Sequence, residues 1–504
     1  MAYNDSTTIG EIMSLAAKVR EENDVFETGK RKLAVIFLRR LLDLGPNATV
    51  EDLEASYKVC SPHEDIPDNS EEFWTYVEKE YLRLDSEPKE KFAEIALRIN
   101  EDLEALAKNI SEITKELAIL EEKNSKGGRL KPEERYYKHQ LVYFKNKNLA
   151  AKDEIVDFMT RKIRGYAVSA ASVKYPALAV VDSIFGNSPY AFGRRFGWAW
   201  ADPYDFRSLD IFSNKFLDLP LSSHREVVNE CKASPAKFKE YAVAYIGGIP
   251  GEVDSLRVKL NDLVGKSHIL FERKSIIETM LRHYEAKDYL SLVSMAPLQI
   301  EGIFADICRE IGVSEEQLDS SSLNDKLQHI DTRMRSFFFF EYYSFKFPVL
   351  RNLIAHGGLV DGDLEEMAHR LMLDLLPVCE LAVSEDLPLF RALEVLSGAS
   401  NGKPDKLVEW LDLRSVTIPK FYNAHDAILK ADAHYASQPF WDYLERRLKL
   451  LDMVGLDVAE EVKIAGRIKR EGLAGAQAQK FLKSTVPTYA KSLSQRGGQS
   501  ANDG

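Results

Sequence analysis

The clearest pattern of apolar and polar positions along the chain is a heptad repeat between residues 99 and 120. Its apolar residues follow one another at alternating steps of four and three: Ile99, Leu103, Leu106, Ile110, Ile113, Leu117 and Leu120. Such a period is typical of a helix that packs along a partner helix. Gly127, Gly128 and Pro132 follow the repeat, and together they predict a break in the helix.

A second amphipathic segment follows this break. Its apolar positions lie on a comparable seam that has Asn148 as its polar member: Leu141, Phe144, Ala151, Ile155 and Phe158. Two helices joined by a short glycine-containing turn are expected to form an antiparallel hairpin. A protruding coiled coil and two helices of a globular bundle use the same seam, so the pattern favours neither. Both interpretations give this segment an architectural role.

Helical periodicity also dominates the rest of the chain, and no segment suits a strand. We therefore predict an all-α protein of several helical bundles, with a prior of about two to four domains for a chain of 504 residues. The expected regions are an N-terminal helical region at 1–85, the antiparallel helical hairpin at 86–166, an irregular helical connection at 167–262, a bundle at 263–390 and a C-terminal helical region with a basic tail at 391–504.

Two segments have a composition that suits RNA. Residues 184–206 carry eight aromatic residues interleaved with glycines and the pair Arg194 and Arg195. Aromatic rings beside arginines can stack bases, but ordinary packing is the favoured interpretation because aromatic residues dominate burial in any fold. Residues 463–496 carry eight Lys and Arg residues against the single acid Glu471. This stretch could bind an RNA backbone, or it could equally be the solvated face of a helix.

The composition is that of a globular protein and argues against a disordered chain or a nucleic-acid coat protein. Hydrophobic residues make up 45% and charged residues 29% of the chain, which is typical of a globular protein and not of a disordered one. The net charge of −12 argues against a general nucleic-acid coat protein, although a local basic patch can still bind RNA. The four cysteines are far apart and form no CxxC pair, as expected of reduced thiols.

Targeting and cofactor motifs give no positive signal. The N-terminus lacks a secretion signal, and no run approaches the roughly 18 apolar residues of a membrane helix. We therefore expect a soluble, cytoplasmic protein without a membrane partner. The triplet at 265–267 fails as a phosphate loop because Leu260 stands where its first glycine should be. His425 and Asp426 form a lone pair without further metal ligands, so we expect no cofactor and no metal.

The stretch FPVLRNLIAHGG at 347–358 carries the strongest chemical signal. Pro348 suits the first turn of a helix, and Gly357 suits the position just past its end. Asn352 and His356 are four residues apart and share a helical face, so Asn352 can orient the imidazole. Arg351 is about 140° away from His356 around the helix. Both residues can hold one phosphate if two copies of the helix face each other across a dimer axis.

These residue types match metal-free cleavage of RNA, in which the 2′-hydroxyl attacks the neighbouring phosphate. A histidine can move the protons, typically for a rate gain of about 10²–10⁴-fold. A guanidinium can hold phosphate oxygens and neutralise the developing charge. The structural alternative is a helix end with Arg351 at the surface and His356 interacting with the helix dipole.

The sequence RNLIAH, its glycine exit and the preceding aromatic helix resemble the HEPN superfamily (higher eukaryotes and prokaryotes nucleotide-binding domains). The resemblance covers roughly residues 265–390, and the helix around Glu301 is similar to one that carries an acidic residue in that family. It implies a helical bundle, a homodimer through the 347–358 helix and endoribonuclease activity. By the same resemblance, Arg351 would contact phosphate, Asn352 would orient, His356 would transfer protons and Glu301 would face the site.

We therefore expect a metal-independent endoribonuclease that leaves 2′,3′-cyclic phosphate ends. The resemblance further implies a toxin or an effector of defence against phage, acting on RNA such as tRNA and restrained by a regulatory region or protein partner. The alternative is a non-catalytic helical scaffold or sensor whose HEPN-like domain binds RNA or nucleotide and dimerises. A helical protein without any role in nucleic-acid binding is the third hypothesis.

Overall fold

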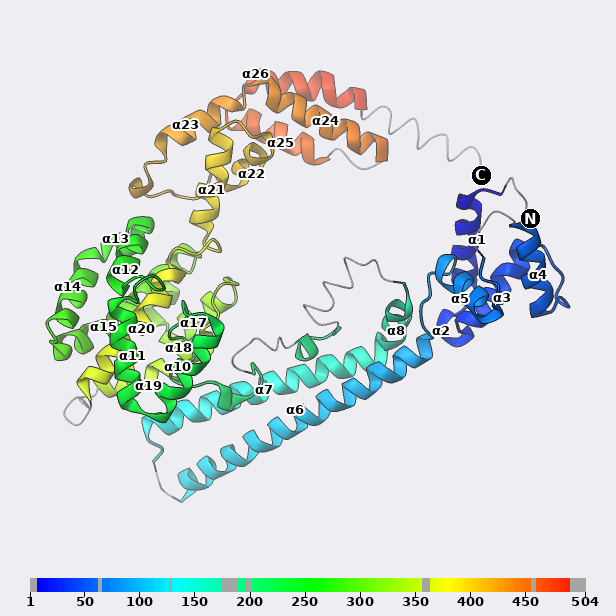
Figure 1. The fold of residues 1–504 in the computed structure, drawn as a ribbon. Helices are drawn as coiled ribbons and strands as arrows, with labels where there is room; N and C mark the ends of the chain where they lie inside the picture. Colours follow the sequence, from blue (N-terminus) through cyan, green and yellow to red (C-terminus); the bar gives the residue numbers. More distant parts are fainter. Residues whose placement is uncertain are drawn as a thin grey trace. The chain divides into compact units, whose positions relative to one another are not determined.

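The computed structural model describes residues 7–61, 66–126, 129–173, 188–194, 202–355, 363–454 and 459–489. Every regular element within these ranges is a helix, which confirms the predicted all-α fold (Figure 1). The described residues form two isolated antiparallel β-bridges, Leu84–Ser172 and Ile249–Val253. The chain divides into two compact units, residues 1–210 and 211–504.

The first unit begins with five helices around their own hydrophobic core: α1 (Ile9–Glu22), α2 (Val25–Thr28), α3 (Lys30–Leu41), α4 (Val50–Cys60) and α5 (Ser70–Glu80). Thr8 and Thr49 begin α1 and α4 with capping boxes, in which the threonine side chain and an acidic residue satisfy each other's backbone N–H groups. Phe37, Tyr57 and Phe73 are completely buried between these helices.

A long helical hairpin follows (Figure 1). It consists of α6 (Pro88–Ser125), with 38 residues, and α7 (Pro132–Arg161), with 30 residues. Both helices begin at a proline, whose missing N–H is not needed in a first helical turn. The heptad residues Ile99, Leu106 and Ile113 are completely buried, so the seam read from the sequence is the surface along which α6 and α7 pack.

A third layer covers part of the hairpin seam. It consists of α8 (Ile163–Ala171), η1 (Phe192–Arg194) and η2 (Phe206–Ser208). The four described aromatic residues of the segment 184–206 are all buried on the hairpin: Tyr190, Phe192, Tyr204 and Phe206. These four therefore serve packing and not base stacking. Phe185, Phe196, Trp198 and Trp200 lie outside the described residues.

The polar member of the seam, Asn148, holds this layer in place. Its amide is completely buried and donates to the Tyr204 carbonyl at 2.9 Å. Asn109 on α6 donates to the Asn148 side-chain oxygen at 3.2 Å. A buried amide with these partners avoids the cost of an unsatisfied polar group, and it ties α6, α7 and the returning chain together.

The second unit begins with the bundle that contains the RNLIAH sequence. Its helices are α10 (Leu221–Ala233), α11 (Pro235–Gly247), α12 (Leu256–Lys266), α13 (His268–Glu272), α14 (Lys274–Glu285), α15 (Tyr289–Glu310), α16 (Glu315–Ser320), α17 (Leu323–Asp331), α18 (Phe340–Phe345), α19 (Phe347–Ala355) and α20 (Leu364–Leu381). Helix α15 is central, because it packs against α14, α17, α19 and α20.

Helix α15 is also long and apolar enough to cross a membrane, judged by length and composition alone. Its 18-residue window has a mean hydropathy of 1.3, and 44% of that window is buried inside the bundle. The sequence contains no uninterrupted apolar run here because polar residues such as Ser294, Gln299 and Glu301 punctuate the helix. Core helices of globular proteins share this combination of length and composition.

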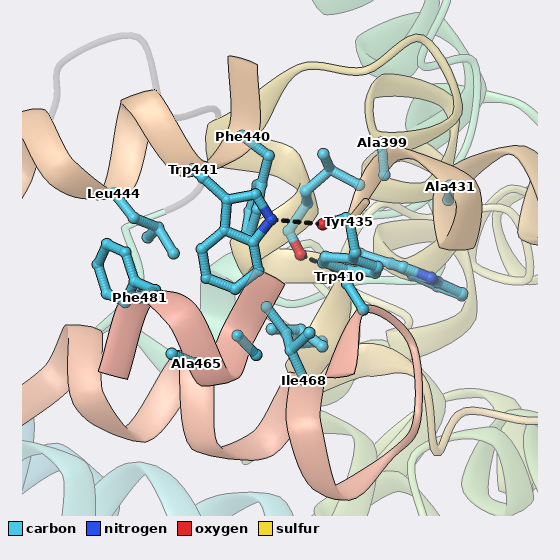
Figure 2. Packing of buried hydrophobic residues seen from close by; sticks show 14 of the residues in the cluster. Ala399, Trp410, Ala431, Tyr435, Phe440, Trp441, Leu444, Ala465, Ile468 and Phe481 are labelled. Carbon is cyan, nitrogen blue, oxygen red and sulfur yellow. Dashed lines mark hydrogen bonds between the residues drawn. The ribbon is translucent and has the colours of Figure 1, made fainter. Parts of the chain in front are cut away.

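The unit ends in α21 (Pro388–Ser400), α22 (Pro404–Leu413), η3 (Lys420–Tyr422), α23 (His425–His434), α24 (Gln438–Val454), α25 (Ala459–Arg470), α26 (Gly475–Lys480) and the π-helical turn η4 (Phe481–Thr485). Trp410, Tyr435 and Trp441 form the centre of their core (Figure 2). The Trp441 indole donates to the Tyr435 carbonyl at 2.8 Å, and the Tyr435 hydroxyl donates to the Leu407 carbonyl at 2.7 Å.

The basic stretch at 463–496 lies partly in these helices. Arg467 pairs with Asp412 and Glu471, so it supports the packing of α25. Five further cations in the described part of the stretch are exposed: Lys463, Lys469, Arg470, Lys480 and Lys483. Lys491 and Arg496 lie outside the described residues. Exposed cations are compatible with RNA binding and with simple solvation, so an RNA-binding role for the stretch remains a hypothesis.

Candidate functional site

Two short consecutive helices position the candidate motif. Helix α18 ends at Phe345, and α19 begins at Phe347, so that Lys346 forms the joint between them. Pro348 fits the first turn of α19 because an N–H is not needed there. Phe347 and Leu350 face the core, whereas Arg351 and Asn352 are half-buried at the surface.

The remaining motif residue, His356, follows Ala355 in the sequence and lies outside the described residues, as do Gly357 and Gly358. The predicted geometry between Asn352 and His356 therefore stays a prediction. The described part of the motif ends with α19 at Ala355.

The structure brings Arg351, Asn352 and Glu301 together. The Arg351 Nη2 donates to Glu301 Oε2 at 2.8 Å, and its Nη1 donates to Asn352 Oδ1 at 3.1 Å. Glu301 lies on the central helix α15, and its side chain is 19% exposed, whereas that of Arg351 is 36% exposed. The guanidinium thus sits at the surface in a fixed orientation. Its two hydrogen bonds occupy only part of its five N–H donors.

A second cation, Lys326 on α17, completes this cluster. Its Nζ lies 3.8 Å from Glu301 Oε1, and its side chain is only 13% exposed. One carboxylate therefore faces a different cation with each of its oxygens, and the three charged groups carry a net positive charge. No feature of the sequence singled out Lys326, because it lies on another helix and belongs to no motif.

The motif helix is held in place by a buried polar network next to it. Lys215 Nζ lies 2.6 Å from Asp374 Oδ1 on α20, and both side chains are completely buried. Lys215 also donates to the Tyr342 hydroxyl at 3.0 Å and to Asn214 Oδ1 at 2.9 Å. The Tyr342 hydroxyl donates to Asp374 Oδ2 at 3.1 Å, and the Tyr343 hydroxyl donates to the Asp374 carbonyl at 2.7 Å.

This network fixes α18, which leads directly into α19. Burial raises the pKa of Tyr342 and of Tyr343 well above the usual value, so both phenols remain protonated donors. Each buried charge has a partner, which is the condition under which ionic groups are tolerated inside a protein. The described polar network therefore has a structural role: it sets the position of the helix that carries Arg351.

The aromatic run before the motif mainly belongs to the core. Phe337 packs against Phe304 and Tyr343, whereas the side chain of Phe338 is 75% exposed. The run therefore divides between core and surface, as consecutive residues near a helix must.

A buried histidine lies elsewhere in the same bundle. The His369 ring on α20 is completely buried, and its Nδ1 lies 3.0 Å from the Tyr284 hydroxyl. Its Nε2 has no hydrogen-bond partner among the described residues. Burial lowers the pKa of His369, so its interior environment favours the neutral imidazole.

Other kinds of site have little support in the described parts of the chain. These contain no group of three or more His, Cys, Asp or Glu side chains that could hold a metal ion. All four cysteines are free thiols, and burial raises the pKa of Cys231 and Cys308 to about 11, which disfavours the reactive thiolate.

A polar hollow of about 540 Å³ lies between α16 and α17, with Asp325 and His329 among its lining residues. None of Arg351, Asn352 and Glu301 lines it, so it is separate from the candidate motif. Comparison of the whole chain with protein-family models, with curated proteins and with solved structures finds no match.

Proposed function

We propose that the protein is a metal-independent endoribonuclease of the HEPN type, which cleaves RNA by attack of the 2′-hydroxyl and leaves 2′,3′-cyclic phosphate ends. The observation that carries the proposal is the half-buried Arg351, oriented by Glu301 at 2.8 Å and by Asn352 at 3.1 Å on the helix that leads to His356. A guanidinium held in this way is preorganised for a phosphate oxygen, because its orientation is set before the ligand arrives.

Each residue has a distinct role in this proposal. Arg351 binds the scissile phosphate and stabilises the charge that develops on it. His356 transfers a proton to or from the reacting oxygens, and Asn352 orients its imidazole. Glu301 on α15 orients the guanidinium before the substrate binds. The reaction exchanges one P–O bond for another, so it needs no oxidant or reductant.

The proposal includes a homodimer, because the sequence predicts that Arg351 and His356 lie about 140° apart around one helix, which is an awkward angle for gripping a single phosphate. Two copies of the 347–358 segment facing each other would form a composite site. The further expectations are an RNA substrate such as tRNA, a cytoplasmic protein, restraint by the helical regions or by a protein partner, and a role as a toxin or in defence against phage.

The test is incubation of the purified full chain with total RNA and tRNA in EDTA, compared with the His356→Ala variant on a denaturing gel. The proposal expects cleavage by the wild-type protein alone and an unchanged dimer and circular dichroism spectrum for the variant. A full chain that cleaves no RNA and is harmless when expressed at high level would contradict it.

The second candidate is a non-catalytic scaffold or sensor that binds RNA or nucleotide. It is favoured by the ion pair itself, because an arginine bound to a carboxylate can also serve only to hold α19 on α15. The two candidates differ in which residues function requires. A scaffold tolerates His356→Ala and fails with a change in the hairpin seam, such as Leu106→Ala, whereas the nuclease fails with His356→Ala.

A further inference from the structure

The Glu301 carboxylate occupies a position between two cations that come from two different helices. Its Oε2 lies 2.8 Å from Arg351 Nη2 on α19, and its Oε1 lies 3.8 Å from Lys326 Nζ on α17. The side chains of Glu301 and Lys326 are 19% and 13% exposed, against 36% for Arg351. The cluster is therefore partly shielded from water. Charges in such a place interact more strongly than charges at a fully exposed surface.

We propose that this position is a phosphate-binding subsite, with Lys326 as its second cation and Glu301 as the anion that occupies it when no substrate is bound. A phosphodiester of the RNA replaces the carboxylate between Arg351 and Lys326. The inference rests on the proposed function only in taking RNA as the source of the phosphate.

The chemistry of the two anions supports the exchange. A carboxylate and a phosphodiester each offer two oxygens that share one negative charge, so a phosphodiester can face the same two cations. A guanidinium binds either group through parallel N–H donors, and an ammonium binds either as a point charge. The exchange replaces one singly charged anion with another, so an anion lies between the two cations before and after it. This avoids the cost of leaving a partly buried charge without a partner.

The contacts of Lys326 leave its ammonium group able to bind a further anion. Its backbone contacts α15, where the Cys308 thiol donates to the Lys326 carbonyl at 3.4 Å. Its ammonium, in contrast, lies 3.8 Å from Glu301, beyond the range of a good charged hydrogen bond. Within the described residues Lys326 makes no other ion pair, so its charge remains available to a phosphate placed beside Arg351.

Glu301 then competes with the substrate. Removing its charge by Glu301→Gln keeps the size of the side chain and leaves both cations for the phosphate. We expect this variant to bind RNA about three- to tenfold more tightly, as loss of a partly exposed competing ion pair implies. Lys326→Met keeps the apolar stem and removes the charge. We expect weaker binding and a salt dependence whose slope falls by about 0.7, the value for one lost phosphate contact with single-stranded RNA.

The test measures fluorescence anisotropy of a labelled 2′-O-methyl RNA octamer bound to the full chain over a series of NaCl concentrations. The methyl group blocks the attacking hydroxyl, so the assay reports binding alone. The matched control is Glu285→Gln, which makes the same charge change at the surface pair Arg257–Glu285, with 2.7 Å between Nη2 and Oε1. Circular dichroism melting confirms that each variant is folded.

Tighter binding by Glu301→Gln but not by Glu285→Gln, together with a shallower salt slope for Lys326→Met, supports the subsite. Equal binding by the two Glu→Gln variants, or an unchanged slope for Lys326→Met, overturns it. Unmodified RNA then separates the two proposals. If the octamer data support the subsite and unmodified RNA stays intact, the nuclease proposal fails while the phosphate-binding subsite stands.

Discussion

Arg351 on α19 and Glu301 on α15 are separated by 50 residues in the sequence, and their guanidinium and carboxylate lie 2.8 Å apart. The contact joins the surface helix that carries the motif to the central helix of the bundle. Because Glu301 also faces Lys326, the contact brings three helices to one charged cluster. In the proposed function, a substrate phosphate binds at this cluster.

The first prediction concerns the shape of the Arg351 side chain. Arg351→Lys keeps the positive charge and its attraction to Glu301, but it loses the planar fork that grips two phosphate oxygens. We expect RNA cleavage to fall by about 10²-fold, the usual cost of losing one preorganised donor to a transition state. The measurement is the rate of cleavage of a labelled RNA in EDTA. Arg257→Lys, at a surface pair of the same unit, should retain the full rate, and equal rates for both variants would refute the role of the fork.

The second prediction concerns the buried pair Lys215–Asp374, in which both side chains are completely buried. Asp374→Ala leaves the Lys215 ammonium without its carboxylate, and we expect a loss of about 3–5 kcal/mol in the free energy of unfolding. Urea unfolding of the full chain measures the loss. The control is Asp262→Ala, which removes a surface carboxylate that is 58% exposed and paired with Lys266. A similar small effect of both changes would show that the network does not stabilise the bundle.

The third prediction concerns the hairpin seam. Leu106 is completely buried between α6 and α7, whereas Leu97 on the same helix is 65% exposed. Leu106→Ala removes buried methyl groups and creates a cavity, so we expect a loss of about 2–5 kcal/mol in the stability of the first unit. Leu97→Ala should change it by about 0.5 kcal/mol or less. Thermal and urea unfolding of the two variants provide the comparison, and equal stability would contradict the seam.

The fourth prediction concerns pH. Burial lowers the pKa of His369 in the folded chain, whereas the unfolded chain has the ordinary value of about 6.5. As the pH falls through that value, the unfolded chain takes up a proton that the folded chain resists, so stability falls. Nearby Asp363 and Glu365 have lowered pKa values because each hydrogen-bonds with Lys239, so their contribution is lost only at more acidic pH.

His369→Phe should therefore remove part of the loss of stability between pH 7 and pH 5. The measurement is the urea midpoint at several pH values for the wild-type chain and the variant. His425→Phe is the control, because its ring is exposed at the start of α23. An identical pH dependence for His369→Phe and the wild-type chain would show that His369 does not cause this loss.

The sequence predicted those features that depend on neighbouring residues. The heptad steps and the glycines after them are sufficient to predict the two helices of the hairpin. Asn148 lies on the seam between them, as predicted. Its partner, the Tyr204 carbonyl, could not be predicted, because nothing in a local pattern shows that an irregular segment returns to cover the hairpin. That covering segment is held by long-range packing of aromatic side chains.

In the candidate site, too, some residues are indicated by the sequence and others only by the tertiary fold. A local sequence motif indicates Arg351 and Asn352, and a family resemblance indicates Glu301. Lys326, in contrast, joins the cluster only because α17 packs on α15. The pair Lys215–Asp374 is separated by 159 residues, so only the tertiary fold reveals that a charged residue before α10 supports the motif helix.

The most direct measurement of the central claim is mass spectrometry of the ends produced from a defined RNA in EDTA, with a second substrate that carries a single 2′-deoxy residue at the cut site. The account predicts 2′,3′-cyclic phosphate ends with the wild-type protein, no cut with His356→Ala, and no cut at the 2′-deoxy position. Cleavage that persists at the 2′-deoxy position, or products with 3′-hydroxyl ends, would contradict attack by the 2′-hydroxyl.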